Sequence, residues 1–203
     1  MDLEEDLRLY LPQYLSEDNL VELKKQLKAF GEGHDTGEYF TTRLKEEPFL
    51  FQGDGVKSIM CNLPDPTLKE DVPVLLLSNT CDMDINNKRL NQCRIMYSPI
   101  LNLDKYIAVL ERKGLSTNQI SNHIKEIKNQ AISQILYLPT AILWGHDSIV
   151  MFDRAISIPL SKESIEKMVY TRSFSLSNYG FYLLLLKLSY HFTRIQEKVD
   201  RSA

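Results

Sequence analysis

The sequence predicts an α+β protein in which a small closed β-barrel carries helices at both ends and one helical insert. Short apolar runs bounded by turn-forming residues recur between residues 47 and 160. Helical periodicity dominates residues 1–46 and 161–203, and it returns inside the middle region at about 103–133. Several short strands of this kind favour a small barrel over a doubly wound sheet.

The composition is that of a globular chain with a substantial core. Of the 203 residues, 43% are hydrophobic and 25% are charged, and the formal net charge is −3. These values exclude a largely disordered chain, a collagen-like chain and a small disulfide scaffold. The net charge marks no general nucleic-acid or membrane binder, so any such binding requires a local patch.

Cysteine usage and hydropathy predict a reduced, cytoplasmic protein that does not enter a membrane. The three cysteines are an odd number, and the first six residues are acidic where a secretory signal is basic. The most apolar stretch, residues 179–186, ends at Lys187 and is far shorter than the roughly 20 residues that cross a bilayer. We expect free thiols and no cofactor.

The first region, residues 1–46, is predicted to be a helical extension. Leucine and tyrosine side chains recur at helical spacing, and Ser16 is a suitable N-cap for a second helix. Gly31 and Gly33 end that helix. Acidic side chains outnumber basic ones, so we interpret this segment as a collar or a docking arm rather than a phosphate-binding element.

The middle region changes to the residue pattern of strands. The runs expected as strands are residues 56–61, 73–78, 94–99, 135–139, 148–152 and 155–158. The turn Gly53–Asp54–Gly55 precedes the first of them, and Asp54 is expected to accept hydrogen bonds from backbone amides. This turn lacks the glycine pattern and the Lys-Ser/Thr pair of a phosphate loop.

Two further helical segments complete the architecture. The insert, broken at Gly114, is mildly basic. After Ser161, a plausible N-cap, the chain ends in a long helix from about Ser177. Apolar side chains cover much of the circumference of this helix, so we expect it to be buried against the barrel, a second copy or a partner.

The order of motifs in the middle region resembles the MazF/PemK family of toxin endoribonucleases. The resemblance rests on Gln52–Gly53–Asp54, the runs 72–79 and 95–100, and the later runs 138–140 and 147–158. It implies an SH3-like barrel that pairs as a homodimer, acts on RNA and is neutralised by a bound antitoxin segment. Such a protein belongs to a toxin–antitoxin or phage-defence type of system.

The sequence departs from this family at the two positions that carry its chemistry. The family uses an arginine before the proline of the first strand motif and a threonine after the second. These positions hold Val72 and Leu101, whose side chains donate no hydrogen bond. The inherited active site is therefore absent if the alignment holds, and Arg89 and Arg94 are the candidates to replace the guanidinium.

The residues expected to form a replacement catalytic site are Cys81, Asp82 and His146. Cys81 and Asp82 directly follow a predicted buried strand, and His146 directly precedes another. A thiol beside an imidazole that a carboxylate orients meets the requirements of an activated thiolate. Alternatively, Cys81 fills space and Asp82 accepts amides in a turn. No paired Cys or His spacing supports a metal site, so none is predicted.

A local basic patch is the predicted nucleic-acid interface. Its expected members are Arg89, Arg94, Lys105, Arg112 and Lys113. Three functions remain open on this basis. They are an RNA-binding or RNA-cleaving toxin-like protein, a non-catalytic module that binds another protein such as an antitoxin, and a thiol enzyme that uses Cys81.

Overall fold

The computed structural model describes residues 38–61, 66–87, 90–140 and 145–193, together with Val21 and Lys25. The chain divides into two compact units, residues 1–37 and residues 38–203. In the first unit, Val21 and Lys25 are helical and exposed, and the rest of the predicted extension up to residue 37 lies outside the described residues. Residues 38–46 hold strand β1 (Phe40–Thr41) and a turn.

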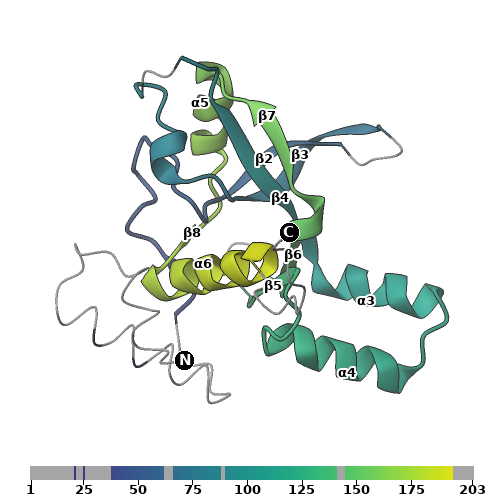
Figure 1. Cartoon of the computed structure of the whole chain (residues 1–203). Helices are drawn as coiled ribbons and strands as arrows, with labels where there is room; N and C mark the ends of the chain where they lie inside the picture. Colours follow the sequence, from purple (N-terminus) through teal and green to yellow (C-terminus); the bar gives the residue numbers. More distant parts are fainter. Residues whose placement is uncertain are drawn as a thin grey trace, which may run out of the picture. The chain divides into compact units, whose positions relative to one another are not determined.

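A six-stranded antiparallel sheet forms the centre of the second unit (Figure 1). Its strands are β2 (Gly55–Cys61), β3 (Leu68–Leu76), β4 (Arg94–Asn102), β5 (Ile135–Leu138), β6 (Ser148–Met151) and β7 (Ile156–Pro159). The strand order is β2-β3-β4-β6-β5, and β7 also pairs with β4. With the helices described below, this sheet confirms the predicted mixed α+β class.

The long strand β4 organises the sheet because it has three partners. Its first residues, 94–97, pair with β7, and its last residues, 100–102, pair with β6. Residues 97–99 pair with β3. Strands β6 and β7 follow each other along the chain, and the short 3₁₀ helix η2 (Phe152–Arg154) separates them. A single nine-residue strand thus connects both ends of the sheet.

The prediction of a closed barrel is wrong. Strands β2 and β5 stand at the two ends of the strand order, and no pairing joins them among the described strands. Helices contact these two terminal strands, since α4 (Thr117–Lys128) contacts β5 and α5 (Lys162–Tyr170) contacts β2. At the start of β2, the segment after α5 bonds the strand's outer edge, because the Gly55 amide donates to the Phe174 carbonyl and the Ser173 amide donates to the Gly55 carbonyl.

Side-chain caps explain where the helices begin. The Asn102 side chain accepts a hydrogen bond from the Lys105 amide at 2.9 Å and caps α3 (Leu103–Arg112). Helix α4 starts with a capping box between Ser116 and Gln119. Ser161 and Ser164 form the equivalent box at the start of α5. Each helix start is therefore encoded within a few residues.

The sheet supports two separate hydrophobic cores. One lies between β2, β3, β4 and α5 and includes Val74, Ile95, Tyr97 and Met168. The other lies where the insert packs on β5 and β6, around Leu103, Ile127, Ile135, Tyr137 and Ile149. The two ends of β4 thus belong to different packing environments.

Helix α6 (Asn178–Thr193) packs within the second unit. Its start meets the small sheet of β1 and β8 (Ser175–Leu176), where Tyr179 contacts the Tyr39 ring edge-on with centroids 5.3 Å apart. A Cβ on Gly180 would lie 2.3 Å from the Tyr39 carbonyl oxygen, so only glycine permits this close approach. Further along, Leu186, Tyr190 and Phe192 remain exposed.

Candidate binding cleft

A cleft of about 420 Å³ borders the core between β2, β3, β4 and α5, to which its lining residues Leu50 and Met83 belong. Three segments line it: residues 48–51, residues 80–86 and the first turns of α5. We call residues 48–51 the cleft wall. All three segments belong to the second unit, and the cleft contains Cys81, one of the predicted site residues.

Polar side chains after β3 fix the segment that carries Cys81. The Ser78 hydroxyl accepts the Met96 amide at 2.8 Å, and the Asn79 side chain accepts the Cys81 amide at 2.9 Å. The Thr80 hydroxyl accepts the Gln52 amide at 3.1 Å. These bonds hold the 3₁₀ helix η1 (Thr80–Asp82) against the next strand and the cleft wall, and they leave the Cys81 side chain exposed.

Asp54 anchors the base of the cleft wall, as the turn signal predicted. Its carboxylate accepts the Phe51 amide at 3.0 Å and the Ser175 hydroxyl at 2.6 Å. Arg172 Nε lies 2.9 Å from Asp54 Oδ2, an ion pair in which the N–H is not aligned for a hydrogen bond. Burial raises the pKa of Asp54, and the contacts from Ser175, Phe51 and Arg172 oppose that rise.

The surface of the cleft combines apolar and acidic side chains. Phe49 and Ile85 are exposed by 54% and 51%, which is unusual for large apolar side chains that line a hollow. Asp84, Glu166 and Lys162 also line it. Lys162 lies 3.8 Å from Glu166, so Asp84 leaves the lining with one net negative charge. This surface suits apolar and cationic groups more than phosphate.

The predicted catalytic residues do not come together. Cys81 lines the cleft and Asp82 ends η1, whereas His146 lines a separate, very small hollow with Phe40, Ser148 and Phe174. The His146 ring contacts the Ser148 hydroxyl at 3.2 Å. No imidazole lines the cleft, so the described residues place no histidine base beside the Cys81 thiol.

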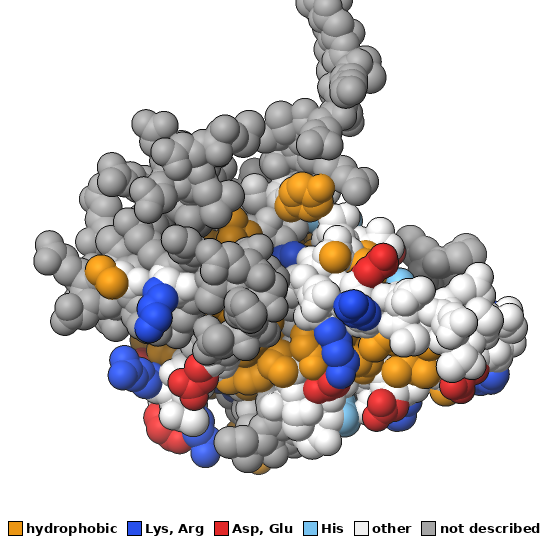
Figure 2. Space-filling view, turned by 90° about the horizontal axis from the view of Figure 1, so that it is seen from below, with side chains coloured by type: hydrophobic (Ala, Val, Ile, Leu, Met, Phe, Trp, Pro, Cys, Tyr) orange, Lys and Arg blue, Asp and Glu red, His pale blue; other side chains and the backbone are white. Residues whose placement is uncertain are grey.

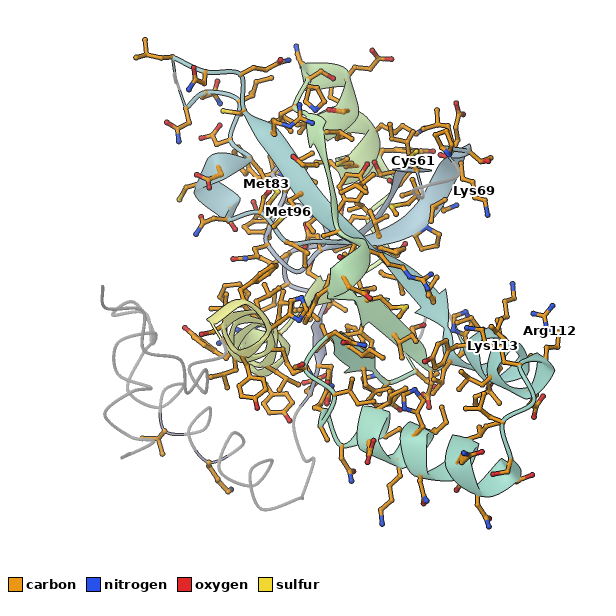
Figure 3. All side chains as sticks on the ribbon, turned by 45° about the vertical axis from the view of Figure 1, so that its right-hand side comes forward. Cys61, Lys69, Met83, Met96, Arg112 and Lys113 are labelled. Carbon is orange, nitrogen blue, oxygen red and sulfur yellow. The ribbon has the colours of Figure 1, made fainter. Side chains whose placement is uncertain are left out.

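The predicted nucleic-acid contacts do not form one patch. Arg94 begins β4, whereas Lys105, Arg112 and Lys113 lie on or directly after α3, which follows the other end of that strand. At about 3.3 Å per residue, β4 separates its two ends by roughly 26 Å. Figure 3 shows Arg112 and Lys113 at the far end of α3, away from Met83 of the cleft. Arg89 lies outside the described residues.

The two positions at which the resemblance predicted a catalytic pair, Val72 and Leu101, also lie apart. Val72 packs against the core between β2, β3, β4 and α5, and Leu101 packs against the core between the insert, β5 and β6. Neither residue lines the cleft. This placement offers no shared groove in which a guanidinium and a hydroxyl at these positions would meet.

Two buried cations were not recognised in the sequence. The Arg172 side chain is 3% exposed and lies in a short polar stretch that gives no signal of burial. Lys187 is 6% exposed, and its Nζ donates to the carbonyls of Gln130, at 2.8 Å, and Ile132. A signal for Lys187 existed, because a single lysine interrupts an otherwise apolar helix.

Comparison with known proteins gives no match: no family model fits the chain, and no curated protein is significantly similar to it. In the part of the chain that the structure describes, no group of three or more His, Cys, Asp or Glu side chains is placed to hold a metal ion. No described helix has both the length and the apolar character needed to cross a membrane.

Proposed function

We propose that the protein is an interaction module whose cleft binds an extended segment of a partner protein. The segment presents an apolar side chain next to a lysine or arginine. The observation that carries this proposal is the pair of half-exposed apolar side chains, Phe49 and Ile85, in one hollow of about 420 Å³. Exposed apolar side chains in a concave site are typical of recognition surfaces.

Charge supports a protein partner rather than RNA at this cleft. Asp84 and Glu166 outnumber Lys162 in the lining, so phosphate groups would be repelled and a basic side chain attracted. The neighbouring Glu163 on α5 is exposed and adds to the same potential. Complementary charge at the rim of an apolar contact chiefly directs association and selects the partner.

A binding role also agrees with the chemistry that the site lacks. Cys81 has no imidazole in the cleft, and Val72 and Leu101 replace the arginine and threonine on which the resembled family relies. We therefore favour the non-catalytic module over the thiol enzyme and over an endoribonuclease. In terms of the resemblance, the sheet is a divergent, open form of the MazF/PemK-like scaffold, and its partner is an antitoxin-like segment.

Peptide display tests this proposal directly. Random peptides are selected on the wild-type protein, and the affinities of the enriched peptides are then measured by fluorescence polarisation. We expect an apolar residue beside Lys or Arg in the enriched sequences. Ile85→Asp is expected to weaken binding at least about tenfold, the effect of losing one important apolar contact.

The matched control is Leu68→Asp, because Leu68 is exposed by 57% but lies on β3 outside the cleft. This variant should bind the enriched peptides as the wild type does. Enrichment of no peptide, or equal losses in the two variants, would refute the cleft as the binding site.

RNA binding by the helical insert is the second candidate. Lys105, Arg112, Lys113 and Lys125 form no ion pair with any described carboxylate, whereas Lys128 is paired with Asp147 at 2.8 Å. Against this, Figure 2 shows cationic and anionic side chains side by side over the face seen from below. Lysine and arginine side chains of the insert that have no ion-pair partner among the described residues favour contact with phosphates, although they do not form a patch of a single sign.

Salt dependence of RNA affinity tests the second candidate. The triple variant Lys105→Ala, Arg112→Ala, Lys113→Ala should reduce the slope of log affinity against log salt by about 2 for a single-stranded RNA. Lys167→Ala on α5 is the control, and its slope should be unchanged. An equal slope for the triple variant and the wild type would exclude the insert as the RNA-binding surface.

A further inference from the structure

Arg172 connects the two sides of the cleft. It follows directly after Thr171, the C-cap of α5, whose first turns form one side of the cleft. Its guanidinium reaches the backbone that leads into the other side, the cleft wall of residues 48–51. Thus α5 lines one side of the cleft, and the residue that follows its C-cap binds the backbone of the opposite side.

The contacts of the guanidinium concentrate on one short segment. Nη1 donates to the carbonyl oxygens of Leu44 and Glu47, the latter at 3.0 Å, and Nη2 donates to that of Phe49. The guanidinium also lies 5.6 Å from the centroid of the Phe51 ring. Three carbonyls within six residues therefore share one cation, and the two terminal nitrogens of the planar guanidinium reach them together.

Asp54 completes the arrangement from beneath. It pairs with Arg172 Nε, and the same carboxylate oxygen accepts the Phe51 amide from the wall. The side chains of Arg172 and Asp54 are 3% and 0% exposed, so water does not compete for these contacts. The wall is thereby fixed on its carbonyl side by Arg172 and on its amide side by Asp54.

We infer that Arg172 is a positioning residue that holds the cleft wall in the shape that accepts the partner segment. This inference rests on the proposed peptide binding at the cleft. Arg172 itself does not line the cleft, and it acts by placing Phe49, whose carbonyl it binds and whose ring is half-exposed in the cleft. A preformed wall lowers the ordering cost of binding.

The variant Arg172→Lys isolates this role. Lysine keeps the positive charge beside Asp54 but lacks the planar, five-donor fork whose separate nitrogens reach Asp54 and three carbonyls at different positions. In the free protein, hydrogen exchange of the Phe51 and Gln52 amides, which donate to Asp54 and Thr80, should accelerate at least about tenfold, because their opening no longer breaks the contacts of Arg172. Exchange within β4 should be unchanged, which distinguishes loss of the wall from general destabilisation.

Affinity for the enriched peptides is the second readout. Arg172→Lys should weaken the binding of these peptides at least about tenfold. Arg154 is an exposed arginine on η2, and Arg154→Lys should leave peptide binding unchanged. Faster wall exchange with unchanged peptide affinity would overturn the inference and leave the proposed function standing. If the wild type binds no peptide, the proposed function fails and the inference fails with it.

Wild-type exchange keeps the inference testable if Arg172→Lys does not fold. The Phe51 and Gln52 amides, which donate to Asp54 and Thr80, should exchange at least about tenfold more slowly than unstructured peptide amides. Exchange of both amides at the unprotected rate would show that nothing holds the wall, which would overturn the inference.

Discussion

One buried cation, Arg172, lies behind the cleft wall and another, Lys187, lies where α6 meets the end of the helical insert, and the two are compensated differently. Arg172 has the Asp54 carboxylate and three carbonyl oxygens. Lys187 has two carbonyl oxygens and forms no ion pair with a described carboxylate. The comparison shows that a multiply bonded arginine fixes backbone shape, whereas a lysine among carbonyls leaves a charge that burial can neutralise.

The two regions also differ in the charges that they present to solvent. The cleft combines half-exposed apolar side chains with acidic ones, whereas the insert carries cations without ion-pair partners among the described residues. A basic apolar segment fits the first surface, and phosphate fits the second. The difference therefore assigns the two candidate partners to two separate surfaces of one unit.

The largest loss of unfolding free energy is expected when the buried ion pair between Asp54 and Arg172 is broken. Asp54→Ala would leave the Arg172 charge buried without a carboxylate and remove acceptors from Phe51 and Ser175. We expect the free energy of unfolding to fall by about 3–5 kcal/mol, measured by chemical denaturation. Asp153→Ala, at an exposed position, should change it by less than about 0.5 kcal/mol. Equal effects would contradict the special role of the pair.

Lys187, the buried cation without an ion-pair partner among the described residues, predicts that the free energy of unfolding depends on pH. Burial lowers the pKa of Lys187 from 10.5 to about 8, so between these values the unfolded chain binds more protons than the folded chain. The free energy of unfolding should therefore rise with pH across this window, by at most about 3 kcal/mol from this residue.

Lys187→Met provides the reference for that measurement, because it lacks the titrating amine at a similar side-chain length. Denaturation of both proteins at pH 8 and pH 10 gives the difference that belongs to Lys187. A difference between the two proteins that does not change with pH would show that Lys187 keeps an ordinary pKa.

A smaller loss of unfolding free energy is expected from removing Asp147, which pairs with Lys128 at the end of α4. Asp147 binds Lys128 Nζ at 2.8 Å and accepts the Thr140 amide at 3.0 Å. Burial alone would raise its pKa, but hydrogen bonds from Lys128, Tyr137 and Thr140 and the charge of Lys128 outweigh burial and lower it.

Asp147→Ala should therefore cost about 1–2 kcal/mol of unfolding free energy at neutral pH. Because the folded pKa of Asp147 is lowered, this contribution is present above its ordinary pKa of 3.8 and is lost as the pH falls from there through the lowered folded pKa. Denaturation at pH 7 and pH 2.5 measures it, and a larger loss at the lower pH would contradict the assigned contacts.

The smallest change in unfolding free energy is expected from a substitution on the surface of the cleft. Ile85 is exposed by 51%, so Ile85→Asp should change the free energy of unfolding by less than about 0.5 kcal/mol. Thermal denaturation of the variant checks this. A cost of several kcal/mol would place Ile85 in the core and weaken the interpretation of the cleft as a binding surface.

Much of the fold could be predicted because its signals are local. The mixed α+β class follows from short apolar runs and helical periodicity, and Asn102, Ser116 and Ser161 cap helices by contacts within three residues. The boundaries of β3 could not be predicted, because Leu68 to Asp71 read as a charged loop. Leu68 and Lys69 are strand because they pair with Cys61 and Met60 of β2, which is a non-local cause, and the register shifts between Lys69 and Val72.

The site was predictable only in part, for the same reason. The Asp54 turn and the position of Cys81 after a buried strand follow from adjacent residues, whereas the exposure of the Cys81 thiol, which contradicts the space-filling alternative, does not. The predicted meeting of Cys81 with His146 depended on how separate strands assemble, and the two residues line different hollows. Contacts of Arg172 with Leu44, Glu47 and Phe49 span more than 120 residues, so no local pattern announces them.

By itself, the sequence determined the approximate positions of most strands, turns and helix starts, though not the first half of β3, because periodicity and capping depend on neighbouring residues. Only the tertiary structure decided that the sheet stays open, that Arg172 rather than a surface residue holds the cleft wall, and that Lys187 is buried. These outcomes depend on strand pairing and burial among residues far apart in the chain, where packing decides between arrangements that each segment alone would permit.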